Sequence, residues 1–327
     1  MSNKSTTYGW IGQNIPTQGT NGNEGIFSLS EINQLENDIS WDVTPFNVEY
    51  LVIAGGGSGG FSYGTNVSRG SGGGGAGGYR TNYASENTGG GLSGEDDLQI
   101  TTKASYSVTV GAGGPTHDIG RTKGNDSSFH TISSEGGGLG RASNQGVQTD
   151  TNGGSGGGVG YNQSTRSSGT TGQGFGGGLG WTNGSNFTSG SGGGAAAAGE
   201  DATNTAGRNG GNGVQSSITG VATYRGGGGA SASSGVTTYT SIGTGGLGGG
   251  GGSSYGDNGD ANTGGGGAAC GNNANGGGGG SGVVILRYPN TFTINVGAGL
   301  TASAGEQTDG SDKYIEITAG TGTVSWS

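Results

Sequence analysis

VEYLVIAGGGSGG, residues 48–60, runs from an apolar segment directly into a glycine tract, and GGGGGSGVVILRYP, residues 276–289, reverses that order near the other end of the chain. Further glycine tracts lie between them, and glycine makes up 88 of the 327 residues. A tract so poor in side chains cannot fold by burying them, and each glycine loses more backbone freedom on ordering than any other residue. The tracts are therefore either flexible linkers or segments that order together, backbone against backbone.

Three features of the sequence favour order. The tracts recur from residue 55 to residue 282, which is typical of a repeat architecture. The apolar segments 48–54 and 283–288 require burial, and the segments between the tracts carry aromatic residues, in which disordered linkers are poor. Collagen is excluded, because there is no strict three-residue period and there are only four prolines. What remains is the left-handed glycine helix with three residues per turn, whose outward N–H and C=O groups bond to neighbouring helices.

The sequence therefore predicts a mostly irregular and β fold, a packed polyglycine-II helix sandwich with a few β-strands, a short N-terminal helix and a small C-terminal β tail. It divides into an N-terminal attachment segment over residues 1–46, a glycine-rich domain over residues 47–289 and a small C-terminal β domain over residues 290–327. In the first part, Ser28 and Glu31 form a capping-box pattern that predicts a helix near residues 29–39. So small an apolar segment cannot be a self-sufficient domain, so we expect it to dock elsewhere through Trp10, Ile32, Leu35 and Ile39.

Strands are predicted wherever the sequence is apolar or alternates between apolar and polar residues, namely at residues 48–54, 98–102, 106–110, 127–132 and 283–288. The first and the last of these have similar character, so we expect them to pair and to close the glycine-rich region. Pro289 then ends the last strand. In the C-terminal part, residues 290–327, we expect a β segment at TFTINVGAG, a turn at Asp309-Gly310, and then two strand segments, KYIEIT and TVSWS.

Charge and composition exclude several classes of protein. The net charge is −10, and the 12 Lys and Arg residues are scattered singly, so no basic stripe for nucleic acid is formed. No apolar stretch approaches the roughly 20 residues of a membrane span, and the N-terminus lacks the pattern of a secretory signal. Cys270 is the one cysteine, so no intrachain disulfide can form.

A dinucleotide fingerprint is imitated by Gly55, Gly57 and Gly60 after the first predicted strand. That fingerprint works only where a helix follows, because the helix N-terminus receives the pyrophosphate. The sequence that follows, FSYGTNVSRG, cannot form one. We therefore expect no nucleotide and no other cofactor.

Catalytic and metal-binding patterns are equally sparse. His117 and His130 have no metal-ligand spacing, and Glu95, Asp96 and Asp97 are consecutive in a loop, which predicts a solvated turn. An alternation that resembles a calcium loop, but lacks its terminal Glu, is formed by Asp257, Asn258, Asp260 and Asn262. Turn chemistry explains it better, so the sequence predicts neither an enzyme nor a metal site.

Aromatic residues in the polar loops are the most informative side chains. One explanation is structural, with rings that cap the glycine helices. The other is recognition, because Tyr and Trp set among Ser, Asn and Gly give rigid amphipathic contact with adaptable hydrogen bonding. The candidates for receptor binding are Phe61, Tyr63, Tyr161, Trp181, Phe187, Tyr239 and Tyr255.

The order of a strand, a glycine tract, YSVTVGAGG, DSSFHTISSEGGGLG and the closing GVVILRYP resembles the glycine-rich domains of tailed-phage adhesins, and T-even long-tail-fibre tip adhesins are the closest parallel. The resemblance covers about residues 48–289, while the two ends look more like parts of glycine-rich virion proteins of marine phages. It implies that loops at one end of the scaffold contact a bacterial surface protein or polysaccharide. The corresponding segments here are 61–70, 141–152, 161–173, 181–189, 230–244 and 253–263.

From this resemblance and the missing secretory signal we expect a non-enzymatic virion protein, a tail-fibre or receptor-binding protein assembled in the host cytoplasm. Its partners would be other phage tail proteins, through the N-terminal segment, and a host outer-membrane protein or surface polysaccharide, with a homotrimer as a candidate oligomeric state. Two alternatives stay open. One is a purely structural tail or decoration protein. The other is an ice-binding protein, since some antifreeze proteins use packed polyglycine helices.

Overall fold

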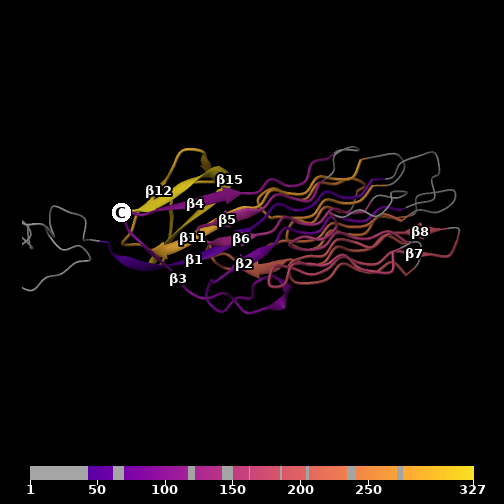
Figure 1. Cartoon of the computed structure of the whole chain (residues 1–327), viewed down its shortest axis with the longest axis horizontal. Coiled ribbons are helices and arrows are strands. Elements are labelled where there is room, and N and C mark those ends of the chain that lie inside the picture. The colour runs from indigo at the N-terminus through magenta and orange to yellow at the C-terminus, as the bar shows by residue number, and fades with distance from the viewer. Residues whose placement is uncertain are drawn as a thin grey trace, which may run out of the picture.

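The computed structural model describes residues 43–61, 70–116, 122–141, 150–161, 163–184, 186–203, 206–233, 241–252, 254–270 and 275–327. This part of the chain is elongated, with a β-sheet at one end and glycine tracts that continue from it to the other end (Figure 1). The predicted helix near residues 29–39 and the attachment residues Trp10, Ile32, Leu35 and Ile39 lie outside the described residues.

An eleven-stranded antiparallel sheet forms the first end, with the path β2-β1-β11-β15-β4-β5-β6, and with β3 on β1 and β12, β13 and β14 on β15. Its strands are β1 (Pro45–Ile53), β2 (Tyr79–Thr81), β3 (Leu98–Thr101), β4 (Ser105–Val110), β5 (Ser127–Phe129), β6 (Ile132–Ser134), β11 (Val283–Pro289), β12 (Ile294–Val296), β13 (Leu300–Ala302), β14 (Gln307–Asp309) and β15 (Asp312–Trp326). Two separate hairpins are formed by β7 (Trp181–Thr182) with β8 (Phe187–Thr188), and by β9 (Val214–Ser216) with β10 (Thr223–Arg225).

The sheet curls until its two edges nearly meet. On β6, the Ser134 hydroxyl donates a hydrogen bond of 2.8 Å to the Val52 carbonyl oxygen of β1. On β2, Arg80 Nη1 donates to the Ser133 carbonyl oxygen at 3.0 Å. Side chains therefore bridge the last gap, which no ladder of backbone hydrogen bonds closes among the described strands.

The predicted pairing of the first and last apolar segments is confirmed. β1 and β11 are antiparallel, with Leu51 opposite Ile285 and Val52 opposite Val284. Both faces of β1 are buried over residues 50–53, where Val52 belongs to the main core inside the sheet and Leu51 to a second cluster on its other face. A strand covered on both faces needs a continuous apolar run, which is why the sequence here does not alternate.

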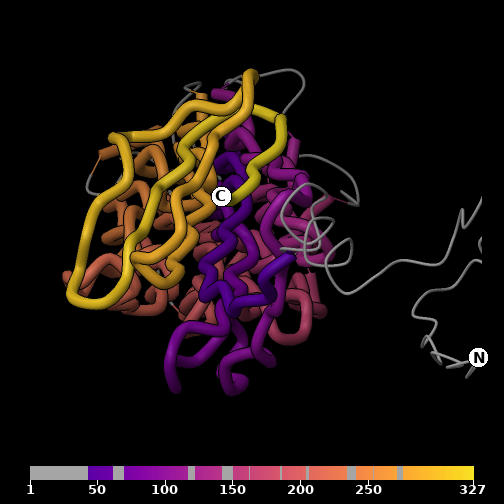
Figure 2. Tube along the Cα trace, turned by 90° about the vertical axis from the view of Figure 1, so that its left-hand side faces the viewer, coloured from indigo at the N-terminus to yellow at the C-terminus, as the bar shows by residue number. Residues whose placement is uncertain are grey.

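The C-terminal residues join the same sheet. β14 and β15 are connected by the predicted turn, where Gly310 has a φ of 64°. The two strand segments expected after that turn are one continuous strand, β15, with Gly320 in the left-handed region at its middle. In Figure 2 this C-terminal trace, coloured yellow, lies over the sheet end of the molecule.

The predicted fold class is wrong. Among the described residues the one helical element is η1 (Gly89–Gly91), a single 3₁₀ turn in which Gly90 is not helical. The regular secondary structure is all-β, and a nearly closed antiparallel sheet organises it. The prediction treated the glycine tracts as the organising element, whereas the apolar side chains gather in the sheet, which includes the C-terminal strand.

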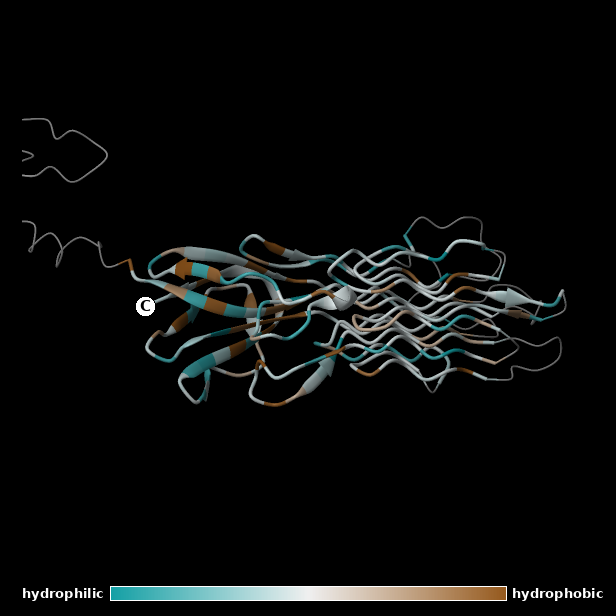
Figure 3. Ribbon diagram, turned by 90° about the horizontal axis from the view of Figure 1, so that it is seen from below, coloured by the Kyte–Doolittle hydropathy of each residue, from teal (hydrophilic) through white to brown (hydrophobic). Residues whose placement is uncertain are grey.

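The glycine tracts are ordered, as predicted, rather than flexible linkers. Their N–H groups donate to tracts far away in the sequence, as in Gly57 to Gly75 and Gly75 to Gly138, both at 2.8 Å. A Cβ atom on Gly57 would lie 2.1 Å from the Gly138 carbonyl oxygen, so only glycine fits there. Figure 3 shows the contrast with the sheet, because the strands alternate between hydrophilic and hydrophobic residues while the tracts are mostly pale.

Candidate functional site

Described residues of several predicted recognition segments come together at the end of the tracts farthest from the sheet. Gly72 N–H donates to the Arg141 oxygen at 2.9 Å, and Gly70 N–H donates to the Phe187 oxygen at 2.9 Å. Ala232 N–H reaches the Ser71 oxygen at 3.1 Å. These bonds bring together described residues of four segments, namely 61–70, 141–152, 181–189 and 230–244. The β7–β8 hairpin lies at this end in Figure 1, which we call the loop end.

Two of the predicted aromatic residues form a pair at the loop end. The ring centroids of Tyr161 and Phe187 are 4.5 Å apart, with an interplanar angle of 52°. Both rings are half-buried, as is that of Trp181. Trp181 lies in β7, opposite Thr188 of β8, and Phe187 is the residue before Thr188 in β8. The β7–β8 hairpin therefore carries both Trp181 and Phe187. The structure therefore places three of the seven candidates on neighbouring segments.

The other candidates behave differently from one another. Phe61 is only 4% exposed and packs against Cys270, so its ring serves packing at the start of its loop. Tyr255 is 39% exposed, and partial burial raises the pKa of its phenol. Tyr63 and Tyr239 lie outside the described residues.

Arg141 is a loop-end residue that the sequence alone did not single out. It follows the tract Gly136–Gly140 directly and is 4% exposed. Burial lowers the pKa of its guanidinium, although the nearby Tyr161 acts in the opposite direction. A charge placed immediately after a glycine tract was the available clue. Arg141 brings a desolvated cation beside the aromatic pair.

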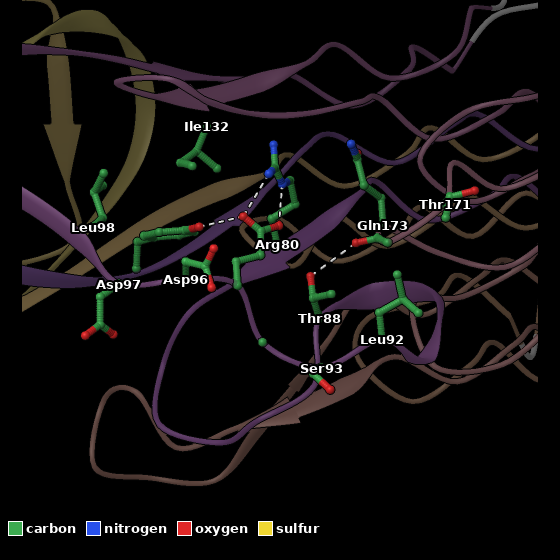
Figure 4. A pocket seen from close by; sticks show the side chains of 14 residues that line it. Arg80, Thr88, Leu92, Ser93, Asp96, Asp97, Leu98, Ile132, Thr171 and Gln173 are labelled. Atoms are coloured by element: carbon green, nitrogen blue, oxygen red, sulfur yellow. Dashed lines mark hydrogen bonds and ion pairs between the residues drawn. The ribbon is translucent and has the colours of Figure 1, made fainter.

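A pocket of about 700 Å³ lies on the other half of the molecule, where β2, β3 and β6 meet the loop of residues 88–97 (Figure 4). At its floor Arg80 binds both oxygens of Glu95, with 2.5 Å from Nε to Oε1 and 2.8 Å from Nη2 to Oε2. The Tyr50 hydroxyl donates to Glu95 Oε2 at 2.6 Å. Burial, followed by this hydrogen bond and the charge of Glu95, raises the pKa of Tyr50.

These contacts make the floor of the pocket a structural latch. Both carboxylate oxygens of Glu95 are engaged by Arg80, and one of them also accepts from the Tyr50 hydroxyl. The sequence predicted a solvated turn here, and Asp96 and Asp97 are indeed exposed, but Glu95 ties the loop to β1 and β2.

The residues with the look of a calcium loop are used internally instead. Asp257 Oδ2 accepts from Ser254 N at 2.9 Å, and Asn258 Oδ1 accepts from Gly278 N at 2.8 Å. Across the part of the chain that the structure describes, no group of three or more His, Cys, Asp or Glu side chains could hold a metal ion. Within the same ranges, no helix has the length and apolar character that a membrane crossing requires.

Comparison with known proteins identifies the family. The model of the family described as "Glycine-rich domain" matches residues 35–289, which is more than half of the chain. The protein therefore belongs to this glycine-rich domain family. No curated protein and no solved structure matches it. The match ends at Pro289, so β12 to β15 lie outside it.

Proposed function

We propose that this glycine-rich domain protein is a non-enzymatic virion component of a tailed phage, a tail-fibre or receptor-binding protein that recognises the bacterial surface through its loop end. Its receptor would be an outer-membrane protein or a surface polysaccharide. The opposite end would attach to other tail proteins, after assembly in the host cytoplasm.

The observation that carries this proposal is the polarity of the molecule. The described residues Gly70, Arg141, Phe187 and Ala232, which lie in four of the predicted recognition segments, come together at the loop end. The first described residue, Val43, lies shortly before β1 of the sheet, and the C-terminus is marked at the sheet end in Figure 1. A recognition protein on a particle needs this arrangement, in which the recognising end and the attached end lie at opposite ends of the molecule.

The chemistry of the loop end also supports recognition. Tyr161, Trp181 and Phe187 are half-buried, so each ring is held in place while part of it stays accessible. Rings of this kind give contact area at low entropic cost. Nearby, Arg166 forms an ion pair with Asp201, and Arg141 is buried close to Tyr161. Partly accessible rings of this kind suit stacking against a sugar or a protein loop.

The test measures binding of the full-length chain to host cells after Tyr161→Ala, Trp181→Ala and Phe187→Ala, singly and together. We expect each single change to weaken binding by roughly tenfold, in line with the loss of one aromatic anchor. The matched control is Tyr224→Ala, because Tyr224 is 42% exposed on β10, away from the loop end. If the triple variant bound as well as the control, the assignment of the loop end would be wrong.

A purely structural tail or decoration protein is the competing function, and the hydrogen-bonded tracts favour it in one respect, because they alone would make a stiff rod. Electron microscopy of virions labelled with an antibody to the chain separates the two. Label at a distal tip supports recognition, whereas label spread along a shaft or over the capsid supports the structural role.

A further inference from the structure

The last residues of the chain form a long hairpin that holds the sheet together. Residues 294–309, which contain β12, β13 and β14, pair along one edge of β15. The other edge of β15 pairs first with β11, where Ile317 faces Val284, and then with β4, where Gly320 faces Val110. We call residues 294–326 the C-terminal hairpin. The β11 and β4 edges that it covers are the acceptor edge.

The core depends on this hairpin. Ile315, Ile317 and Val324 of β15 are at most 3% exposed. Trp326 is 2% exposed and lies within 5.6–6.5 Å, centroid to centroid, of the rings of Phe46, Tyr106, Phe129 and Tyr288. An uncovered acceptor edge would expose these rings together with two unpaired strands, which is a template for association with another chain. Some hairpin must therefore occupy it.

Other edges of the sheet are protected by side chains. At β6, the Ser133 oxygen accepts from Arg80 Nη1 at 3.0 Å and from Gln173 Nε2 at 3.5 Å. At β3, Thr101 N–H donates to the Tyr106 hydroxyl at 2.8 Å. Blocked edges of this kind prevent pairing between sheets. The acceptor edge differs from these two described edges, because its backbone groups are paired by the C-terminal hairpin instead of being blocked by side chains.

Two facts favour exchange of the C-terminal hairpin between copies of the chain. The family match ends at Pro289, so the shared region contains β1, β4 and β11 but not the hairpin that covers them. Only residues 290–293 connect β11 to β12. Short connections of this kind favour exchange of an element between copies of a chain, which is a low-cost route to assembly.

We propose that the acceptor edge is a strand-binding site that takes the C-terminal hairpin of a second copy of this chain, so that copies are linked through their sheet ends. The hairpin of a second copy would pair with the acceptor edge in the register that β15 already has with β11 and β4. It carries the same apolar side chains at the same spacing. The proposal is independent of what the loop end recognises.

Cross-strand disulfides can detect the exchange at a pair that faces solvent. Ser107 of β4 lies opposite Thr323 of β15, and both are exposed. The Ser107 oxygen accepts from His130 N and the Thr323 oxygen accepts from Gly297 N, and neither of these donors lies on β4 or β15. Ser107 and Thr323 are therefore a non-hydrogen-bonded pair of the antiparallel ladder. Opposed residues of this type have Cα atoms about 4.5 Å apart, within the range that a disulfide spans.

The experiment uses full-length chains with Cys270→Ala, so that the introduced cysteines carry the only thiols. It mixes chains carrying Ser107→Cys with chains carrying Thr323→Cys, unfolds them together and refolds them under mild oxidation. A disulfide between the two chains forms in register only if the hairpin of one covers the acceptor edge of the other. The matched control mixes Ser105→Cys with Thr321→Cys. These residues lie on the same strands but face Ser325 and Thr109 instead of each other.

We expect at least about tenfold more linked heterodimer from the first mixture than from the control, because a disulfide forms only at close Cβ separation. A chain carrying both Ser107→Cys and Thr323→Cys should close the bond within itself when refolded dilute. Equal yields from the two mixtures, or no linked product from the first, would overturn the proposal.

Discussion

The sheet and the glycine tracts are stabilised by different means within one molecule. The sheet buries side chains, and burial contributes about 25 cal/mol per Å² of apolar surface. The tracts have almost no side chains to bury, and their described backbones bond laterally, at a net gain of about 1 kcal/mol per bond. The stability of the sheet depends on its buried apolar side chains. The stability of the tracts depends on the lack of Cβ atoms, which allows their backbones to approach one another closely. The two regions should therefore fail under opposite substitutions.

Removing a side chain should cost most in the sheet. Trp326→Ala leaves a cavity among four aromatic rings of the core, and such a change lowers the free energy of unfolding by about 3–5 kcal/mol. Urea denaturation followed by circular dichroism measures the loss. Tyr224→Ala, at an exposed ring on β10, is the control. A loss for Trp326→Ala no larger than that of the control would contradict the central role of β15.

Adding a single methyl group should be the damaging change in the tracts. In Gly57→Ala the new Cβ atom would lie 2.1 Å from the Gly138 carbonyl oxygen. The neighbouring tract must move and its lateral hydrogen bonds must lengthen, at a cost of about 2–3 kcal/mol. The same denaturation experiment applies. Gly305→Ala, where a Cβ would meet nothing within 4 Å, should be nearly neutral. Equal effects of the two substitutions would remove the distinction between the regions.

Breaking the latch between the loop 88–97 and the sheet should lower the free energy of unfolding by less than either Trp326→Ala or Gly57→Ala. Glu95→Gln removes the charge that Arg80 binds at two points and weakens the bond from Tyr50. Because these groups are partly exposed, the expected loss is about 1–2 kcal/mol. Asp96→Asn, at an exposed neighbouring carboxylate, should have no measurable effect. Limited proteolysis within residues 88–97 should accelerate in Glu95→Gln and not in the control.

Sequence reasoning succeeded where side chains carry a pattern. The pairing of β1 with β11 follows from two continuous apolar runs, and the turn at Gly310 follows from its dipeptide. The continuity of β15 was missed, because Gly320 and Gly322 interrupt its alternation and suggest two segments. That the tracts are ordered, and not flexible, was predicted. Which tract bonds to which could not be predicted, because runs of glycine have no side chains that would distinguish one neighbouring tract from another. A fold class built on those runs overlooked the sheet.

The loop end was predictable only in part, for the same reason. The aromatic residues could be picked out by their polar surroundings. Which of these aromatic residues lie close together depends on where in space each glycine tract ends. The contact of Tyr161 with Phe187 and the burial of Phe61 therefore could not be foreseen. Arg141 was overlooked because a single charge in a loop resembles any solvated residue, and only its burial makes it notable.

The junction between the two regions should respond to pH, with the smallest of these effects. Glu135, directly after β6, accepts from Lys123 Nζ and from Thr170 Oγ1, both at 2.5 Å. Partial burial acts to raise its pKa, but these hydrogen bonds and the charge of Lys123 outweigh it, so the pKa of Glu135 is lowered. A carboxyl whose folded pKa is lowered contributes stability above its unfolded pKa, and that contribution disappears as the pH falls through the folded pKa.

Glu135→Gln should therefore lower the melting temperature at pH 7 and have progressively less effect as the pH falls below about 4.5. Glu49→Gln supplies the opposite sign, because burial raises the pKa of Glu49. The charged form of Glu49 is disfavoured in the folded protein, so its replacement should help more at pH 7 than at pH 3. Melting curves of both variants and the parent chain at the two pH values test the pair. Parallel shifts for the two variants would show that neither carboxyl is linked to folding through its protonation.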